Sequence, residues 1–282
     1  MWSKACYLLQ ELIKVWCCYN DGNLNTTKVT LTGGGNIKYI KMEYNVNEVD
    51  RQLESLLKSE RDDILTSLNS SMSIGELSLE LIITSIKHCK QQISNIDKHF
   101  LQKNNSVSLR NALITRRKAF EDNLAIWNLC GHIQLTSIQV KDVQKRLYAE
   151  ETNELQKRMA IGEASLLIYE SSKVIIDCTG KDFMDFLNKV LTQKQLEGFK
   201  PLRKELTTFR EGNSKCLKDI RVKTVAHRDL DILNQLDVIE ELNWSDCIQL
   251  LLDYEKILNS FGAFLSSLIP LGMAQLAIVF KQ

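Results

Sequence analysis

The chain has 282 residues, of which 44% are apolar and 25% are charged. An apolar fraction of this size fills a sizeable core, which excludes an intrinsically disordered chain. The 36 Lys and Arg residues balance the 35 Asp and Glu residues, and the formal net charge of +1 gives no global attraction to nucleic acid or anionic lipid. Any anion binding must therefore be local.

Few residues in this chain interrupt helices. Only 2 Pro and 12 Gly occur in the whole sequence, which favours long helical runs and excludes a turn-rich β-sandwich. The sequence therefore predicts an all-α protein built as a helical bundle. We divide it into an N-terminal helical region, residues 1–150, and a C-terminal helical domain, residues 151–282.

The first 47 residues combine a helical pattern with a strand pattern. Apolar residues recur every three to four positions over 1–20, which predicts an amphipathic helix. Apolar and polar residues alternate on both sides of Gly33, Gly34 and Gly35, which indicates a β-hairpin near 28–40. A phosphate-binding loop would continue into Gly-Lys-Ser or Gly-Lys-Thr, and this glycine run does not.

A helical period continues along the remaining chain. It predicts helices over about 48–70, 75–98 and 106–130, with loops at 104–106 and at Gly131. The segment 136–178 is either one long helix or two helices joined near Gly162. Further helices are predicted over 181–193, 202–211, 214–228 and 244–265.

The eight cysteines would allow disulfides in a secreted protein, but a reducing compartment fits this sequence better. The N-terminal segment carries charges within its apolar pattern, unlike a cleavable signal, so we expect a cytoplasmic protein. The sequence contains no Cys-x-x-Cys pair and no Cys/His cluster at zinc-finger spacing, so we predict no metal site. Most of these thiols are expected to be small core residues.

An uncharged segment near the C-terminus allows two interpretations. Residues 261–280 approach the length of a membrane-spanning helix, which permits a tail anchor. Pro270 and Gly272 lie within the segment, and no basic cluster flanks it. We therefore favour a buried helix that breaks at Pro270 over a membrane segment.

Charge is distributed unevenly in the C-terminal half. Residues 194–228 contain ten Lys or Arg and four Asp or Glu, whereas residues 229–255 contain eight acids and no Lys or Arg. The simplest interpretation is a pair of helices that attract each other through surface charges.

The junction of these two stretches carries a more specific pattern. Residues 218–229 read Lys-Asp-Ile-Arg-Val-Lys-Thr-Val-Ala-His-Arg-Asp, with five residues between Arg221 and His227. This motif resembles the signature of the HEPN superfamily, in particular its abortive-infection members. The resemblance extends more loosely over 155–269, through a first helix, a shorter helix at 183–190, the motif helix and a closing helix. Residues 1–150 have no counterpart in it.

The resemblance implies a dimeric all-α domain that acts as a metal-independent endoribonuclease in toxin or antiviral defence systems. It implies RNA as a substrate, no cofactor, a homodimer, and an antitoxin or defence-system partner. Other members of the superfamily bind nucleotides or act as scaffolds. The alternative function is therefore a non-catalytic helical module that binds a nucleotide or a partner protein.

The residue types of the motif suit RNA cleavage without a metal. The reaction requires a base for the 2′-hydroxyl, an acid for the leaving oxygen and a cation for the phosphorane. His227 is the expected acid or base, and Arg221 has the planar fork suited to phosphate oxygens. We also expect phosphate or RNA contacts from Lys218, Lys223 and Arg228, and an orienting role for Asp229.

Helical geometry restricts how this site assembles. Six residues place Arg221 and His227 about 120° apart on an unbroken helix, so they converge only if the helix distorts or a partner subunit completes the site. A structural alternative makes His227 a helix-end residue and Asp229 a cap. Val222 stands where many active members carry a polar residue, and this departure predicts a weak nuclease or a protein that only binds.

Overall fold

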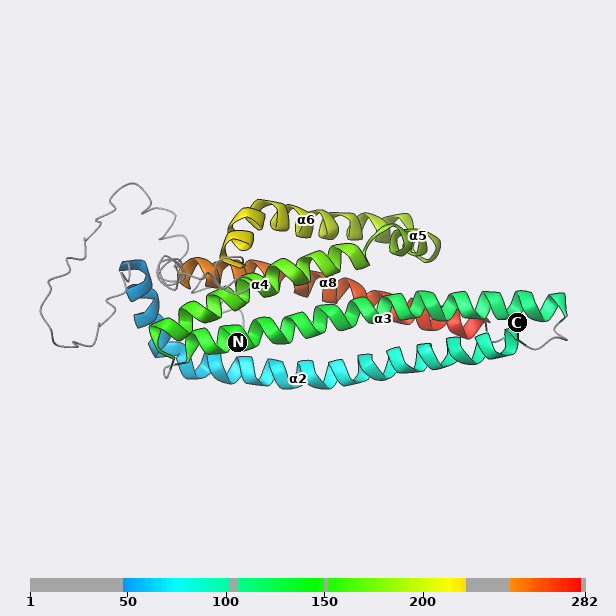
Figure 1. The fold of residues 1–282 in the computed structure, drawn as a ribbon, viewed down its shortest axis with the longest axis horizontal. Coiled ribbons are helices and arrows are strands. Elements are labelled where there is room, and N and C mark those ends of the chain that lie inside the picture. Colours follow the sequence, from blue (N-terminus) through cyan, green and yellow to red (C-terminus); the bar gives the residue numbers. More distant parts are fainter. Residues whose placement is uncertain (1–47, 102–105, 150–151, 222–243, 280–282) are drawn as a thin grey trace, which may run out of the picture. The chain divides into compact units, whose positions relative to one another are not determined.

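The computed structural model describes residues 48–101, 106–149, 152–221 and 244–279 (Figure 1). Within these ranges the chain forms six α-helices and no β-strand, which confirms the predicted all-α class. The helix predicted over 1–20 and the hairpin near 28–40 lie outside the described residues.

Contacts divide the chain into two units, residues 1–67 and residues 68–282. The described part of the first unit, 48–67, belongs to helix α2 (Glu48–Phe100). All packing and sites below concern the second unit. The proposed division into 1–150 and 151–282 stays a prediction.

Helix α2 does not end between residues 70 and 75, so the two helices predicted over 48–70 and 75–98 are one. A Cβ atom at Gly75 would lie 2.8 Å from Gln134 Nε2 and 3.0 Å from Ile138 Cγ1. Gly75 therefore permits a close approach of the next helix instead of ending α2. Further along, Cys89 of α2 packs in one hydrophobic cluster with Phe120 of the next helix.

Helix α3 (Val107–Tyr148) also continues through the predicted loop at Gly131. It begins at Ser106, whose side chain accepts a hydrogen bond from the Leu109 amide at 3.2 Å. The break in the 136–178 segment falls after Tyr148 and not near Gly162. Helix α4 (Glu154–Cys178) follows it.

A capping box explains where α4 starts. The Asn153 side chain accepts a hydrogen bond from the Gln156 amide at 2.9 Å, and the Gln156 side chain accepts one from the Asn153 amide at 3.0 Å. Two of the unpaired amides at the helix start are thereby satisfied. Gly162 is buried within the helix.

Helix α5 (Lys181–Val190) agrees with the predicted helix over 181–193. Helix α6 (Gln193–Arg221) continues through Pro201 and without a break between 211 and 214, so the predicted separation of 202–211 from 214–228 is wrong. Helix α8 (Trp244–Val279) continues through Pro270, so the predicted break there is also wrong. Each proline frees a backbone carbonyl four residues earlier. These carbonyls belong to Glu197 and Ser266, which are exposed and accessible to water, so the helices tolerate the prolines.

The helices of the second unit form a bundle around α3. Helix α3 packs on α8 and on α4, and α4 packs on α6, while α8 also contacts α4 and α6 (Figure 1). The core contains large buried side chains from all of these helices, among them Leu129, Ile168, Leu206 and Tyr254. No described helix is both long and apolar enough to cross a membrane.

Residues 261–268 of the uncharged segment pack into this core. Phe261, Leu265 and Leu268 are almost fully buried. Their spacing of three and four residues makes one apolar side of α8, while Ser266 and Ser267 are exposed. Residues 261–268 therefore belong to a buried helix, as predicted.

Candidate functional site

The predicted site begins at the end of α6. Arg221 is the last residue of this helix, and Lys218 is exposed one turn before it. Val222, Lys223, His227, Arg228 and Asp229 lie outside the described residues. The structure therefore shows the helix that leads into the motif, and the convergence of Arg221 with His227 stays a prediction.

An aromatic cluster fixes the first half of α6 on α8. Phe199 is fully buried, and its ring centroid lies 6.1 Å from that of Phe261 and 4.7 Å from that of Phe264. Phe183 of α5 contacts the same ring at 5.9 Å. Such aromatic pairs stabilise packing beyond their buried area, so this part of α6 has a defined position.

The second half of α6 is held by α4 and α8. Phe209 stacks on Tyr254 of α8 with 5.5 Å between ring centroids, and the guanidinium of Arg210 lies 5.1 Å from the ring centroid of Tyr169 on α4. The Tyr254 hydroxyl lies 2.7 Å from Ser171 Oγ, which links α8 to α4. Burial raises the pKa of the Tyr254 hydroxyl further above neutral pH.

The exposed side of α6 is rich in lysine. Lys200, Lys204, Lys215 and Lys218 are exposed and lie within an arc of about 60°. Glu197 and Glu211 share this side, so its charge is only moderately positive. Lysine contacts of this kind would position a phosphate backbone without reading its sequence.

Arginines form a second row, at the edge of the buried side. Arg203 and Arg210 are half-buried and seven residues apart. Arg210 contacts α4, so this row lies at the α4 edge of α6. The Nε atoms of Arg203 and Arg210 are buried and form no hydrogen bond with described residues.

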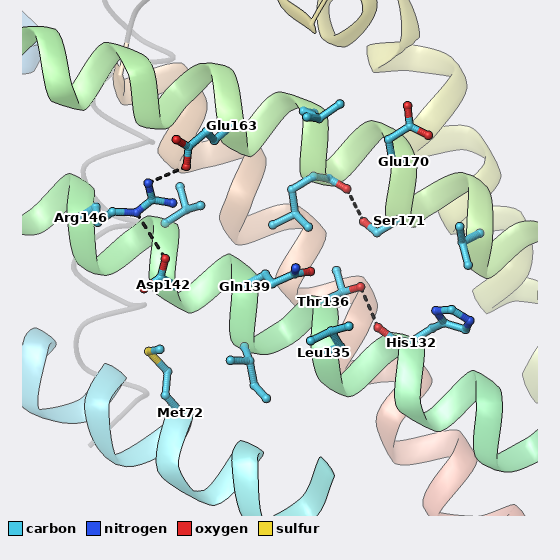
Figure 2. A pocket seen from close by; sticks show the side chains of 15 residues that line it. Met72, His132, Leu135, Thr136, Gln139, Asp142, Arg146, Glu163, Glu170 and Ser171 are labelled. Carbon is cyan, nitrogen blue, oxygen red and sulfur yellow. Dashed lines mark hydrogen bonds and ion pairs between the residues drawn. The ribbon is translucent and has the colours of Figure 1, made fainter. Parts of the chain in front are cut away.

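A groove of about 760 Å³ lies over α3, between α2 and α4 (Figure 2). Its lining is mostly apolar. At one end Arg146 Nη1 lies 2.5 Å from Glu163 Oε2, and Arg146 Nε lies 3.3 Å from Asp142 Oδ2. His132 and Glu170 line the other end. None of these residues belongs to the predicted site.

The sequence reasoning did not single out the groove. The spacing of Asp142 and Arg146 suggests an ion pair on one helix, but the groove requires α3 and α4 to lie side by side. That pairing depends on a helix break after Tyr148, which the sequence interpretation left open. The complete lining consists of Met72, His132, Leu135, Thr136, Ile138, Gln139, Asp142, Val143, Arg146, Glu163, Leu166, Leu167, Glu170, Ser171 and Val174.

A buried polar network joins α3 to α8. Lys141 Nζ lies 3.0 Å from Glu255 Oε1 and donates a hydrogen bond to Ser137 Oγ at 2.7 Å. Gln144 Nε2 donates to Glu255 Oε2 at 3.2 Å. The side chains of Lys141 and Glu255 are only 10% and 4% exposed. Because its members pair with one another, this network is structural.

The described cysteines are free thiols. Burial raises the pKa of Cys130 to about 11 and that of Cys247 to about 12, so neither is a nucleophile at neutral pH. Cys216 is exposed on α6. Among the described residues, no group of three or more His, Cys, Asp or Glu side chains is arranged to hold a metal ion.

No family model, curated protein or solved structure matches this chain. The resemblance of residues 218–229 to the HEPN signature is therefore tested by none of these comparisons.

Proposed function

We propose that this protein is a metal-independent endoribonuclease in which Arg221 stabilises the phosphate and His227 transfers protons. The motif of residues 218–229 carries the proposal, because Arg221 is the last residue of the basic helix α6 and His227 follows it six positions later in the sequence. The HEPN assignment, a toxin or defence role and an antitoxin or defence-system partner belong to the same proposal.

The order of the helices supports it. The resemblance predicts a first helix, a shorter helix, the motif helix and a closing helix. Helices α4, α5, α6 and α8 occur in that order, and α5 has 10 residues against the 25 of α4.

The surroundings of α6 also support a phosphate ligand. Aromatic packing at Phe199 and Phe209 orients the helix. The lysines on its exposed side extend toward Lys218, so an RNA strand along α6 meets repeated positive charge before it reaches Arg221. RNA binding should therefore weaken as the salt concentration rises.

Two copies of the chain suit the chemistry. A single histidine cannot be base and acid at the same instant, whereas two copies supply His227 twice. We therefore propose a homodimer through residues 151–282, with a composite site that uses Arg221 from each subunit.

Cleavage of a mixed RNA pool in EDTA tests this function. The wild-type protein should cut RNA and leave 2′,3′-cyclic phosphate ends, because the 2′-hydroxyl is the nucleophile. His227→Ala and Arg221→Ala should each abolish cleavage without changing the helical circular dichroism. Lys218→Ala should mainly weaken RNA binding and lower its salt dependence.

His132→Ala is the matched control, because His132 is an exposed histidine of α3 outside the motif. It should cleave as the wild type does. Activity that EDTA removes and added metal restores would contradict the mechanism. RNA or nucleotide binding without cleavage would favour the non-catalytic helical module.

A further inference from the structure

Aromatic contacts fix how α6 and α8 run past each other. The ring centroids of Phe199 and Phe264 lie 4.7 Å apart, and those of Phe209 and Tyr254 lie 5.5 Å apart. A step of ten residues forward along α6, from Phe199 to Phe209, therefore matches a step of ten residues back along α8. The two helices are antiparallel (Figure 1), and each residue further along α6 lies level with one residue earlier in α8.

The same register brings two cysteines level with each other. Cys216 follows Phe209 by seven residues on α6, and Cys247 precedes Tyr254 by seven residues on α8. Seven residues are two helical turns, about 10 Å along the axis, and return a side chain to within about 20° of its starting direction. Because Phe209 and Tyr254 stack on each other, Cys216 and Cys247 lie on the facing sides of their helices, two turns beyond the stack.

The two thiols differ in their access to solvent. Cys216 is exposed, whereas Cys247 is only 5% exposed. Burial raises the pKa of Cys247 to about 12, and the negative charges of Asp246 and of a Cys216 thiolate act in the same direction. An electrostatic effect of Cys216 on Cys247 agrees with their closeness in the helix register. Redox-sensing sites commonly place an exposed cysteine beside a second cysteine that resolves its oxidised form.

We propose that Cys216 and Cys247 form a reversible disulfide when a small disulfide such as glutathione disulfide oxidises them. The Cys216 thiolate attacks one sulfur of glutathione disulfide and releases one glutathione thiolate. Cys247 then loses its proton to solvent, and its sulfur displaces the second glutathione from Cys216. The two cysteines together lose two electrons and two protons, and glutathione disulfide is reduced to two molecules of glutathione.

The bond would join the end of α6, five residues before Arg221, to the first turn of α8. A reversible bond is compatible with a reducing compartment, where protein disulfides are mostly transient and serve redox sensing. Neither cysteine belongs to the motif at 218–229, so the disulfide does not depend on the proposed function.

Peptide mapping of the oxidised full-length chain tests the bond. The reduced protein is incubated overnight with glutathione disulfide at about pH 8.5 without denaturant, because the high pKa of Cys247 slows the second step. After unfolding and alkylation with iodoacetamide, trypsin should release the Cys216 and Cys247 peptides joined, two hydrogen masses lighter than the two thiol peptides together. Dithiothreitol should separate them. Circular dichroism of the oxidised protein should match that of the reduced protein.

Cys216→Ser is the decisive variant, because an exposed residue can be changed without disturbing the core. It should yield no linked peptide and leave Cys247 alkylated after unfolding. Cys178→Ser is the matched control, because Cys178 is a half-buried cysteine at the end of α4. It should form the bond between Cys216 and Cys247 to the same extent as the wild type.

Non-reducing gel electrophoresis shows whether the bond forms within one chain. The oxidised protein should migrate as the 32.4 kDa monomer. Glutathione that stays on Cys216 with no bond to Cys247 would overturn the proposal, and so would a covalent dimer joined through Cys216. None of these measurements involves RNA, so failure of the disulfide and failure of the proposed nuclease are separate results.

Discussion

Removal of the Glu255 carboxylate should strongly destabilise the bundle. Glu255→Ala leaves the Lys141 ammonium, 10% exposed, without its ion-pair partner at 3.0 Å. It also removes the acceptor for the Gln144 amide. Removing one partner of a buried ion pair lowers the free energy of unfolding by about 3–5 kcal/mol, because the remaining charge keeps its desolvation penalty. For a chain of this size the cost corresponds to a fall in Tm of roughly 6–20 °C.

Urea unfolding followed by far-ultraviolet circular dichroism measures this loss. Lys256→Ala is the matched control: its partner Asp253 lies 2.9 Å away on the same helix, but these side chains are 59% and 42% exposed. It should cost no more than about 1 kcal/mol. Lys141→Met/Glu255→Leu should be more stable than Glu255→Ala, because neither charge stays buried alone. Equal stability of Glu255→Ala and Lys256→Ala would refute this reasoning.

Three further predictions concern thiols, pH and the motif. Iodoacetamide at pH 8 should label Cys216 before Cys247, as peptide mass spectrometry will show, because Cys216 is exposed and burial raises the pKa of Cys247 from 9.0 to about 12. Burial raises the pKa of Tyr254 as well. The unfolded chain therefore releases both protons at lower pH, and stability should fall above about pH 9, by up to ~1.4 kcal/mol per pH unit for each group. A urea midpoint that rises between pH 9 and 11 would contradict this. Val222→Asn should cleave RNA faster than the wild type if the introduced asparagine orients His227. A slower variant would show that Val222 does not limit the cleavage rate.

The fold class was predictable from the sequence because helix breakers are scarce and apolar residues follow a helical period. Helix ends were less predictable, because glycine and proline act locally and packing can override them. Gly75 permits a close approach of α3. Pro201 frees the backbone carbonyl of Glu197, which is an exposed residue. Asn153 and Gln156 have the spacing of a capping box, which the sequence alone shows.

The sites differ in how much of each could be predicted from the sequence alone. The motif at 218–229 is a local pattern, so sequence alone identifies it. The α3–α4 groove and the network of Lys141 with Glu255 join residues far apart in the chain, and only helix pairing brings them together. Apolar residues lie on two sides of α2, and the sequence does not show that Ile82 and Cys89 are buried while Leu77 and Leu81 are exposed.

The most direct test of the proposed nuclease is a comparison of the wild-type protein with His227→Ala on one RNA pool in EDTA, with analysis of the product ends. The mechanism predicts 2′,3′-cyclic phosphate ends from the wild type and intact RNA from His227→Ala. Equal cleavage by the two proteins would contradict the assignment of His227. Intact RNA from both would contradict the nuclease itself.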